Sequence, residues 1–72
     1  MAQRSVMAGE PVDLNRASVD ELILQIGISE SIAESIIDFR DANGGFDSVE
    51  DLMEVECITE SSYQRIRRKV TV

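Results

Sequence analysis

Apolar positions along the chain recur at the spacing of short helices. The pattern is clearest over residues 18–37, SVDELILQIGISESIAESII, which predict a short helix, a hairpin at 26–29 and a longer helix beginning at Glu30. The apolar residues of the longer helix lie three and four positions apart, namely Ile32, Ala33, Ile36, Ile37 and Phe39. One face of that helix is therefore expected to be buried.

The same pattern returns 30 positions later, over residues 48–67, as SVEDLMEVECITESSYQRIR. Identical residues recur in register at Ser18/Ser48, Val19/Val49, Leu22/Leu52, Ile28/Ile58, Glu30/Glu60, Ser31/Ser61 and Ile36/Ile66. A repeat this regular indicates one helix–hairpin–helix unit used twice, around a pseudo-twofold axis. The expected fold class is all-α, a compact tandem domain of about five short helices.

Turn and capping residues set the expected element boundaries. Residues 18–21 and 48–51 have capping-box spacing, which predicts helix starts after Ser18 and Ser48. Gly27 allows a sharp reversal, and Ser29 and Thr59 are suited to cap the helices that follow the two hairpins. The last helix is expected to run from Glu60 to Arg68 or Lys69, and Asn43-Gly44-Gly45 to end the long one.

Residues between and beyond these helices add to the predicted core. Val12 and Leu14 are expected to point the same way from an extended segment, and 70–72 to form an extended tail. The predicted apolar contributors of the short helices are Leu22, Ile23, Ile26, Leu52, Met53, Val55, Tyr63 and Ile66, with Phe46 as an anchor. We expect one domain over 12–72, preceded by a flexible arm over 1–11.

The charge changes the picture more than the composition does. Fourteen acidic against seven basic residues give a net charge of −7, which disfavours long-range attraction to nucleic acid or anionic lipid. Four of the bases form a C-terminal basic patch, namely Arg65, Arg67, Arg68 and Lys69. This patch suits either the negative end of the last helix's dipole or a binding role.

The candidate chemistry is sparse. The chain has no histidine, and its residues do not assemble a nucleophile with a suitable base, so we expect neither an enzyme nor a small-molecule substrate. The acidic stripe Glu30, Glu34, Asp38 and Asp41 is typical of a solvated helix face, so no metal is expected. Cys57 is interpreted as a small filler at a hairpin apex, because acidic neighbours do not activate a thiol. No apolar run is long enough to insert in a membrane, and the chain as given is expected to be cytoplasmic or soluble.

Several separated motifs carry a resemblance. VDLNRAS (12–18), DELxxxIGIS (20–29), AESIIDFR (33–40), GGFDSVEDLMEV (44–55) and the final TV occur in that order. They resemble the tandem helix-hairpin-helix domain of the ComEA-type competence DNA receptors, and are similar also to the core of photosystem II extrinsic protein U. The resemblance implies weak, sequence-independent binding of double-stranded DNA. It also implies an extracytoplasmic location if the chain is a fragment of an anchored competence-type protein.

The resemblance identifies the hairpins as candidate sites for the DNA backbone, through Gly27, Ile28 and Ser29 in the first and Ile58 and Thr59 in the second. DNA-binding members read Gly-hydrophobic-Gly at each hairpin. Here Ser29 replaces one glycine of the first hairpin, whereas Cys57 and Thr59 replace both in the second. We therefore interpret the first hairpin as impaired and the second as incapacitated. No cofactor is expected, although some relatives hold a monovalent cation through hairpin carbonyls.

Two hypotheses follow for this non-catalytic module. In the first, the hairpins and the basic patch form one weak phosphate site on DNA. In the second, the domain has lost DNA binding and serves protein–protein interaction or assembly, through an apolar patch made by exposed Ile28 and Ile58.

Overall fold

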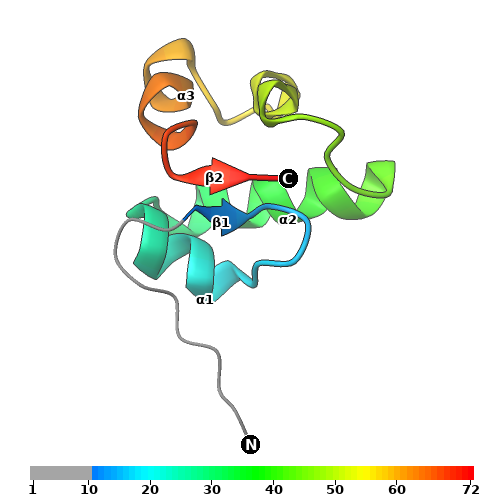
Figure 1. Ribbon diagram of the computed structural model, residues 1–72, viewed down its shortest axis with the longest axis horizontal. Coiled ribbons are helices and arrows are strands. Elements are labelled where there is room, and N and C mark those ends of the chain that lie inside the picture. Colours follow the sequence, from blue (N-terminus) through cyan, green and yellow to red (C-terminus); the bar gives the residue numbers. More distant parts are fainter. Residues whose placement is uncertain (1–10) are drawn as a thin grey trace, which may run out of the picture.

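Short helices and one pair of strands build residues 11–72, the part of the chain that the computed structural model describes (Figure 1). The elements follow one another as β1 (Val12–Asp13), α1 (Val19–Glu21), η1 (Leu22–Ile26), α2 (Glu30–Asn43), η2 (Val49–Glu54), α3 (Glu60–Ile66) and β2 (Val70–Thr71). The prediction of an all-α fold is confirmed. The predicted arm lies outside the described residues, apart from Pro11.

The first unit forms as its local sequence predicts. The Glu21 N–H donates to Ser18 Oγ and the Ser18 N–H to Glu21 Oε1, both over 3.1 Å, so the capping box is complete. α1 continues directly into η1, which has π-helical geometry and ends at Gly27. Gly27 has φ +84°, a left-handed conformation that side chains with a Cβ resist, and this is where the chain reverses.

The long helix α2 begins and ends at the expected residues. Its N-cap is Ser29, whose Oγ accepts a hydrogen bond from the Ile32 N–H over 3.3 Å. At the other end Gly44 has φ +74°, and the N–H groups of Gly44 and Gly45 both donate to the Arg40 carbonyl. These bonds satisfy a carbonyl of the last turn, which has no partner within the helix.

The second unit departs from the first in geometry. Where a helix like the first was expected, η2 is a 3₁₀ helix, with Leu52 and Val55 buried three positions apart. Because three residues complete a 3₁₀ turn, Met53 points to another side, and its side chain is 45% exposed. The prediction of Met53 as a core residue was wrong. Thr59 caps α3 as predicted, with its Oγ1 accepting from the Ser62 N–H over 3.2 Å.

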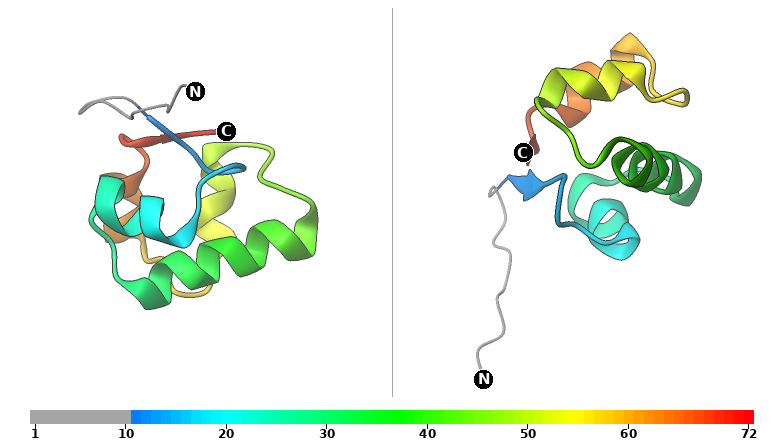
Figure 2. Two further views of the ribbon diagram at one scale, coloured as in Figure 1. Left: turned by 90° about the horizontal axis from the view of Figure 1, so that it is seen from below. Right: turned by 90° about the vertical axis from the view of Figure 1, so that its right-hand side faces the viewer.

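The two ends of the described chain pair with each other. β1 and β2 run parallel, with Val12 opposite Val70, and the N–H groups of Val12 and Leu14 donate to the carbonyls of Lys69 and Thr71 over 2.8 Å each. The two strands lie side by side at one face of the domain in Figures 1 and 2. The strand pairing explains why α3 ends at Ile66, before the expected Arg68 or Lys69. The chain has to turn over 67–69 to bring Val70 beside Val12.

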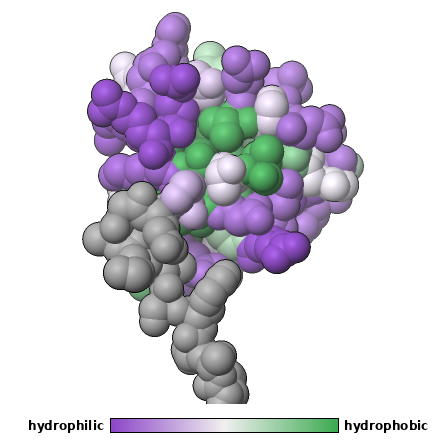
Figure 3. Space-filling view, in the orientation of Figure 1, coloured by the Kyte–Doolittle hydropathy of each residue, from purple (hydrophilic) through white to green (hydrophobic). Residues whose placement is uncertain are grey.

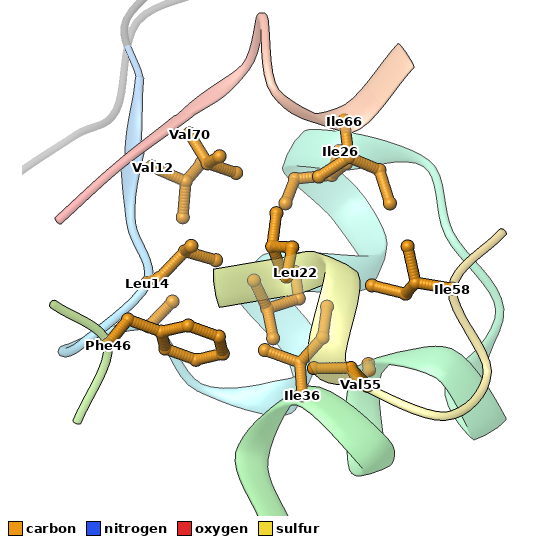
Figure 4. Packing of buried hydrophobic residues seen from close by; sticks show 13 residues of the cluster. Val12, Leu14, Leu22, Ile26, Ile36, Phe46, Val55, Ile58, Ile66 and Val70 are labelled. Atoms are coloured by element: carbon orange, nitrogen blue, oxygen red, sulfur yellow. The ribbon is translucent and has the colours of Figure 1, made fainter. Parts of the chain in front are cut away.

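A single apolar cluster joins the two units (Figure 4). Leu14, Leu22, Ile36 and Leu52 are its largest fully buried side chains, and they come from both halves of the chain. The remaining buried members are Val12, Ala17, Ile26, Ala33, Phe46, Val55, Ile58, Ile66 and Val70. Burying a side chain of this size stabilises the fold by about 1.5–3 kcal/mol. The domain therefore depends on contacts between its units.

Two polar side chains hold the loops against this core. The Phe46 N–H donates to Asn15 Oδ1 over 2.6 Å, and Asn15 Nδ2 donates back to the Phe46 carbonyl over 3.1 Å. Arg40 Nη1 donates to the carbonyls of Leu14 and Ala17 over 3.2 and 2.7 Å. These bonds fix the segment between β1 and α1 to α2 and to the linker between the units. Over residues 11–72, none of the helices has the length and apolar character needed to cross a membrane.

Candidate functional site

The first hairpin presents a backbone that is free to meet a ligand. Gly27 stands between η1 and α2, and an added Cβ there would meet no atom within 4 Å. Among residues 11–72, no acceptor lies at the N–H of Ile28, whose side chain is half-buried against the core. The hairpin therefore offers an open approach and an unused donor beside the N-terminus of a 14-residue helix.

The C-terminal turn of the chain lies against this hairpin. Lys69 Nζ donates to the Ile26 carbonyl over 3.2 Å, and the side chains of Ile26 and Ile66 are neighbours in the core (Figure 4). Together the two segments form a shallow cavity of about 180 Å³, lined by Ile26, Gly27, Ile28, Arg65, Ile66, Arg68 and Lys69. We call this cavity the basic groove. It joins three positive side chains to the backbone of the first hairpin.

Arg67, the C-cap residue of α3, lies away from the groove. Its guanidinium carbon stands 5.9 Å from the centre of the Tyr63 ring, within reach of a cation–π interaction. With Tyr63 it lines a different depression, together with Ser48, Val49 and Glu50. The four bases of the C-terminal patch thus divide into three at the basic groove and one away from it. Around α3 the surface is strongly hydrophilic (Figure 3).

The second hairpin is closed by its own contacts. Ile58 is only 6% exposed and points into the core (Figure 4), and its N–H donates to the Val55 carbonyl over 3.1 Å. The prediction that Ile28 and Ile58 form an exposed apolar patch was therefore wrong. Ile58 is part of the buried core, and Ile28 is partly buried against it. Cys57 Sγ lies 3.2 Å from Ser35 Oγ at an exposed site.

The surroundings of the second hairpin are acidic. A depression next to it is lined by Ser35, Asp38, Phe39, Glu54, Val55 and Glu56, without a basic residue. Within residues 11–72, no group of three or more histidine, cysteine or acidic side chains is placed to hold a metal ion. At the first hairpin the Ile23 carbonyl accepts from the Gly27 N–H and the Ile26 carbonyl from Lys69. Both carbonyls thus accept a hydrogen bond within the protein.

The contact between Lys69 and the first hairpin is the feature that sequence reasoning missed. Lys69 and its acceptor residue Ile26 are 43 positions apart, and no periodic pattern in the sequence connects them. The only sequence feature that could have indicated this contact was the extended tail predicted over 70–72, after the second repeat unit. A tail that returns to Val12 must bring the preceding turn close to the first unit.

Comparison with known proteins identifies the family to which this sequence is similar. The family described as "Helix-hairpin-helix motif" matches residues 7–71. ComE operon protein 1 of Bacillus subtilis is 39% identical over 64 residues, which are 89% of this chain and 31% of that protein. Proteins named endonuclease/exonuclease/phosphatase family domain-containing protein 1 are 43% identical over 61 residues in Danio rerio and 42% over 59 in Homo sapiens.

In those two relatives the match covers 85% and 82% of this chain but only 11% and 10% of the relative. The chain therefore spans less than a third of the length of each curated relative named here. No solved structure matches the chain significantly. The extent of the family match and the identity to the Bacillus protein show that this chain belongs to the helix-hairpin-helix family, as a domain of the ComEA type.

Proposed function

We propose that this chain is a non-catalytic DNA-binding module that holds the sugar-phosphate backbone weakly and without sequence preference. The observation that carries the proposal is the basic groove. Arg65, Arg68 and Lys69 surround the Gly27–Ile28 backbone there, on the first of the two hairpins. Family membership supports the same ligand, since the resemblance is to DNA receptors.

The chemistry of the groove suits a phosphate. Arginine and lysine supply charge, and the Ile28 N–H can donate to a phosphate oxygen. Contacts of this kind position a protein on nucleic acid but carry no sequence information. Backbone binding without sequence preference is the expected result.

The acidic body limits the affinity. The net charge of −7 repels the polyanion at distances within the Debye length, about 10 Å at 0.1 M salt. Only groups that touch phosphates displace counterions and so strengthen binding. The small number of groove cations therefore gives weak binding at physiological salt.

A titration of labelled duplex DNA at several salt concentrations tests the proposal. Three cations on phosphates predict a slope of log K against log salt of about −2.7, or a loss of about 200-fold between about 20 and about 150 mM salt. Replacement of Arg65 or Arg68 by alanine is expected to reduce the slope by about 0.9. Arg67→Ala is the matched control, since Arg67 directly precedes Arg68 and has the same charge but lies outside the groove.

Two outcomes would contradict the proposal. Undetectable binding to duplex DNA at low salt would remove DNA as the ligand. Equal losses in the Arg67→Ala and Arg68→Ala variants would show that net charge acts and the groove does not.

A protein–protein interaction module was the alternative hypothesis. Its motivation was an apolar patch at the two hairpin apices, and burial of Ile58 removes that patch. The enzyme named in the vertebrate relatives is not proposed for this chain either. The matched region is about a tenth of those proteins, so their activity does not transfer to this chain.

A further inference from the structure

The two hairpins are equivalent in sequence but differ in their backbone donors. Ile28 and Ile58 occupy the same position of the repeat. The Ile58 N–H donates to the Val55 carbonyl over 3.1 Å, whereas among residues 11–72 the Ile28 N–H has no acceptor. A donor already bound inside the protein cannot be given to a phosphate without breaking its bond. At this position of the repeat, and among residues 11–72, only the first hairpin retains a free donor.

The charges around the hairpins differ in the same sense. The groove at the first hairpin contains Arg65, Arg68 and Lys69. The depression at the second contains Asp38, Glu54 and Glu56 and no base. A phosphate at the second hairpin would face three carboxylates, and like charges at close range repel strongly. The two repeat units therefore differ in the charge that surrounds their hairpins, which is positive at the first and negative at the second.

We infer that the module grips one nucleic-acid strand, through the first hairpin and the basic groove, and that it does not require a duplex. This inference rests on the proposed function and specifies its ligand. Two competent hairpins related by a twofold axis would contact both strands of a duplex at once. A domain with one competent hairpin has no second contact to gain from the complementary strand.

The test compares a single-stranded oligo-dT with a duplex of the same length, both labelled, at about 100 mM salt. Counterion release alone favours the duplex, because the slope per phosphate contact is about 0.9 for duplex and about 0.7 for single strands. For three cations this difference amounts to about fourfold at that salt concentration. We expect a ratio of affinities near this value.

The outcomes separate the two claims. A duplex preference above tenfold would overturn the inference and leave the proposed function in place. Failure to bind either probe, at low salt as well, would overturn the proposed function and the inference with it.

A variant near the second hairpin gives an independent readout. Glu56→Gln removes an exposed carboxylate from that hairpin without touching the basic groove. If one strand is bound at the first hairpin, the substitution changes both affinities by the same small factor, as does the control Glu50→Gln. A selective gain for the duplex in Glu56→Gln would show the second hairpin facing the other strand, and would overturn the inference.

Discussion

At the scale of single residues, the first turn of α2 sets two requirements against each other. Ser29 caps the N-terminus of α2, and the negative charge of Glu30 in the first turn interacts favourably with the positive end of the helix dipole. The same positive end lies beside the basic groove, where a phosphate would compete with the carboxylate of Glu30. Helix stability and anion binding therefore make opposite demands on this position.

This conflict predicts the effect of Glu30→Gln. Removing the carboxylate is expected to raise the affinity for DNA severalfold while lowering helix stability by about 0.3–1 kcal/mol. Binding titrations and thermal unfolding measure the two effects on the same protein. Glu34→Gln, one turn further along α2, is the control with an equal change in net charge. Equal gains in both variants would contradict a local role for Glu30.

Arg40 is a second residue whose contacts lead to a prediction. Its guanidinium donates to the carbonyls of Leu14 and Ala17, and its side chain is only 20% exposed. Replacing Arg40 with methionine keeps the apolar stem but leaves both carbonyls without this donor. The expected loss in the free energy of unfolding is about 1.5–3 kcal/mol, measurable by urea denaturation.

Arg16 provides the comparison for Arg40. Its side chain is 85% exposed, and its one ion pair within residues 11–72 is a surface contact with Asp13 over 3.7 Å. Arg16→Met is expected to change the free energy of unfolding by less than about 0.5 kcal/mol. Similar losses in the two variants would mean that the carbonyl contacts of Arg40 do not stabilise the fold.

At the scale of elements, the sequence predicted the helix ends that depend on neighbouring residues. The capping box at Ser18, the caps at Ser29 and Thr59 and the end of α2 at Gly44 are confirmed, because each depends on residues within one turn. The 3₁₀ geometry of η2 was missed, since Met53 fits an α-helical apolar face equally well. The burial of Ile58 and the contact of Lys69 were missed as well, because both depend on how the units pack.

Two glycines between elements, Gly27 and Gly45, are expected to differ in how much stability the protein loses when each is replaced by alanine. Gly45 has φ +120°, and an added Cβ would stand 3.0 Å from Asn15 Oδ1. Gly27 has φ +84° and free space around it. Gly27→Ala therefore carries backbone strain alone, about 1–2 kcal/mol, while Gly45→Ala adds displacement of Asn15 from Phe46.

The two alanine variants can be ranked by their melting temperatures. For a domain of this size, about 1 kcal/mol corresponds to about 4–8 °C. Gly45→Ala is expected to melt below Gly27→Ala. The reverse order would show that Asn15 can move without cost, and that its two bonds to Phe46 contribute little.

At the scale of the whole molecule, the strand pair connects stability to the basic groove. β2 holds the C-terminal turn in place by pairing with β1, and Lys69 stands directly before it. Val70 is 6% exposed and part of the core, whereas Val72 is 42% exposed. The same two-residue strand therefore completes the core and keeps Lys69 beside the Ile26 carbonyl.

This arrangement predicts that Val70→Ala weakens stability and binding together. Loss of the buried side chain is expected to cost about 1–3 kcal/mol of unfolding free energy. A loosened β2 also lets Lys69 leave the groove, so the salt slope for DNA is expected to fall by up to about 0.9, even where the protein is fully folded. Unfolding by urea and DNA titration below the melting transition measure the two effects, and Val72→Ala should change neither. An unchanged salt slope in folded Val70→Ala would mean that Lys69 stays in the groove without support from β2. The strand pair would then contribute to stability but not to DNA binding.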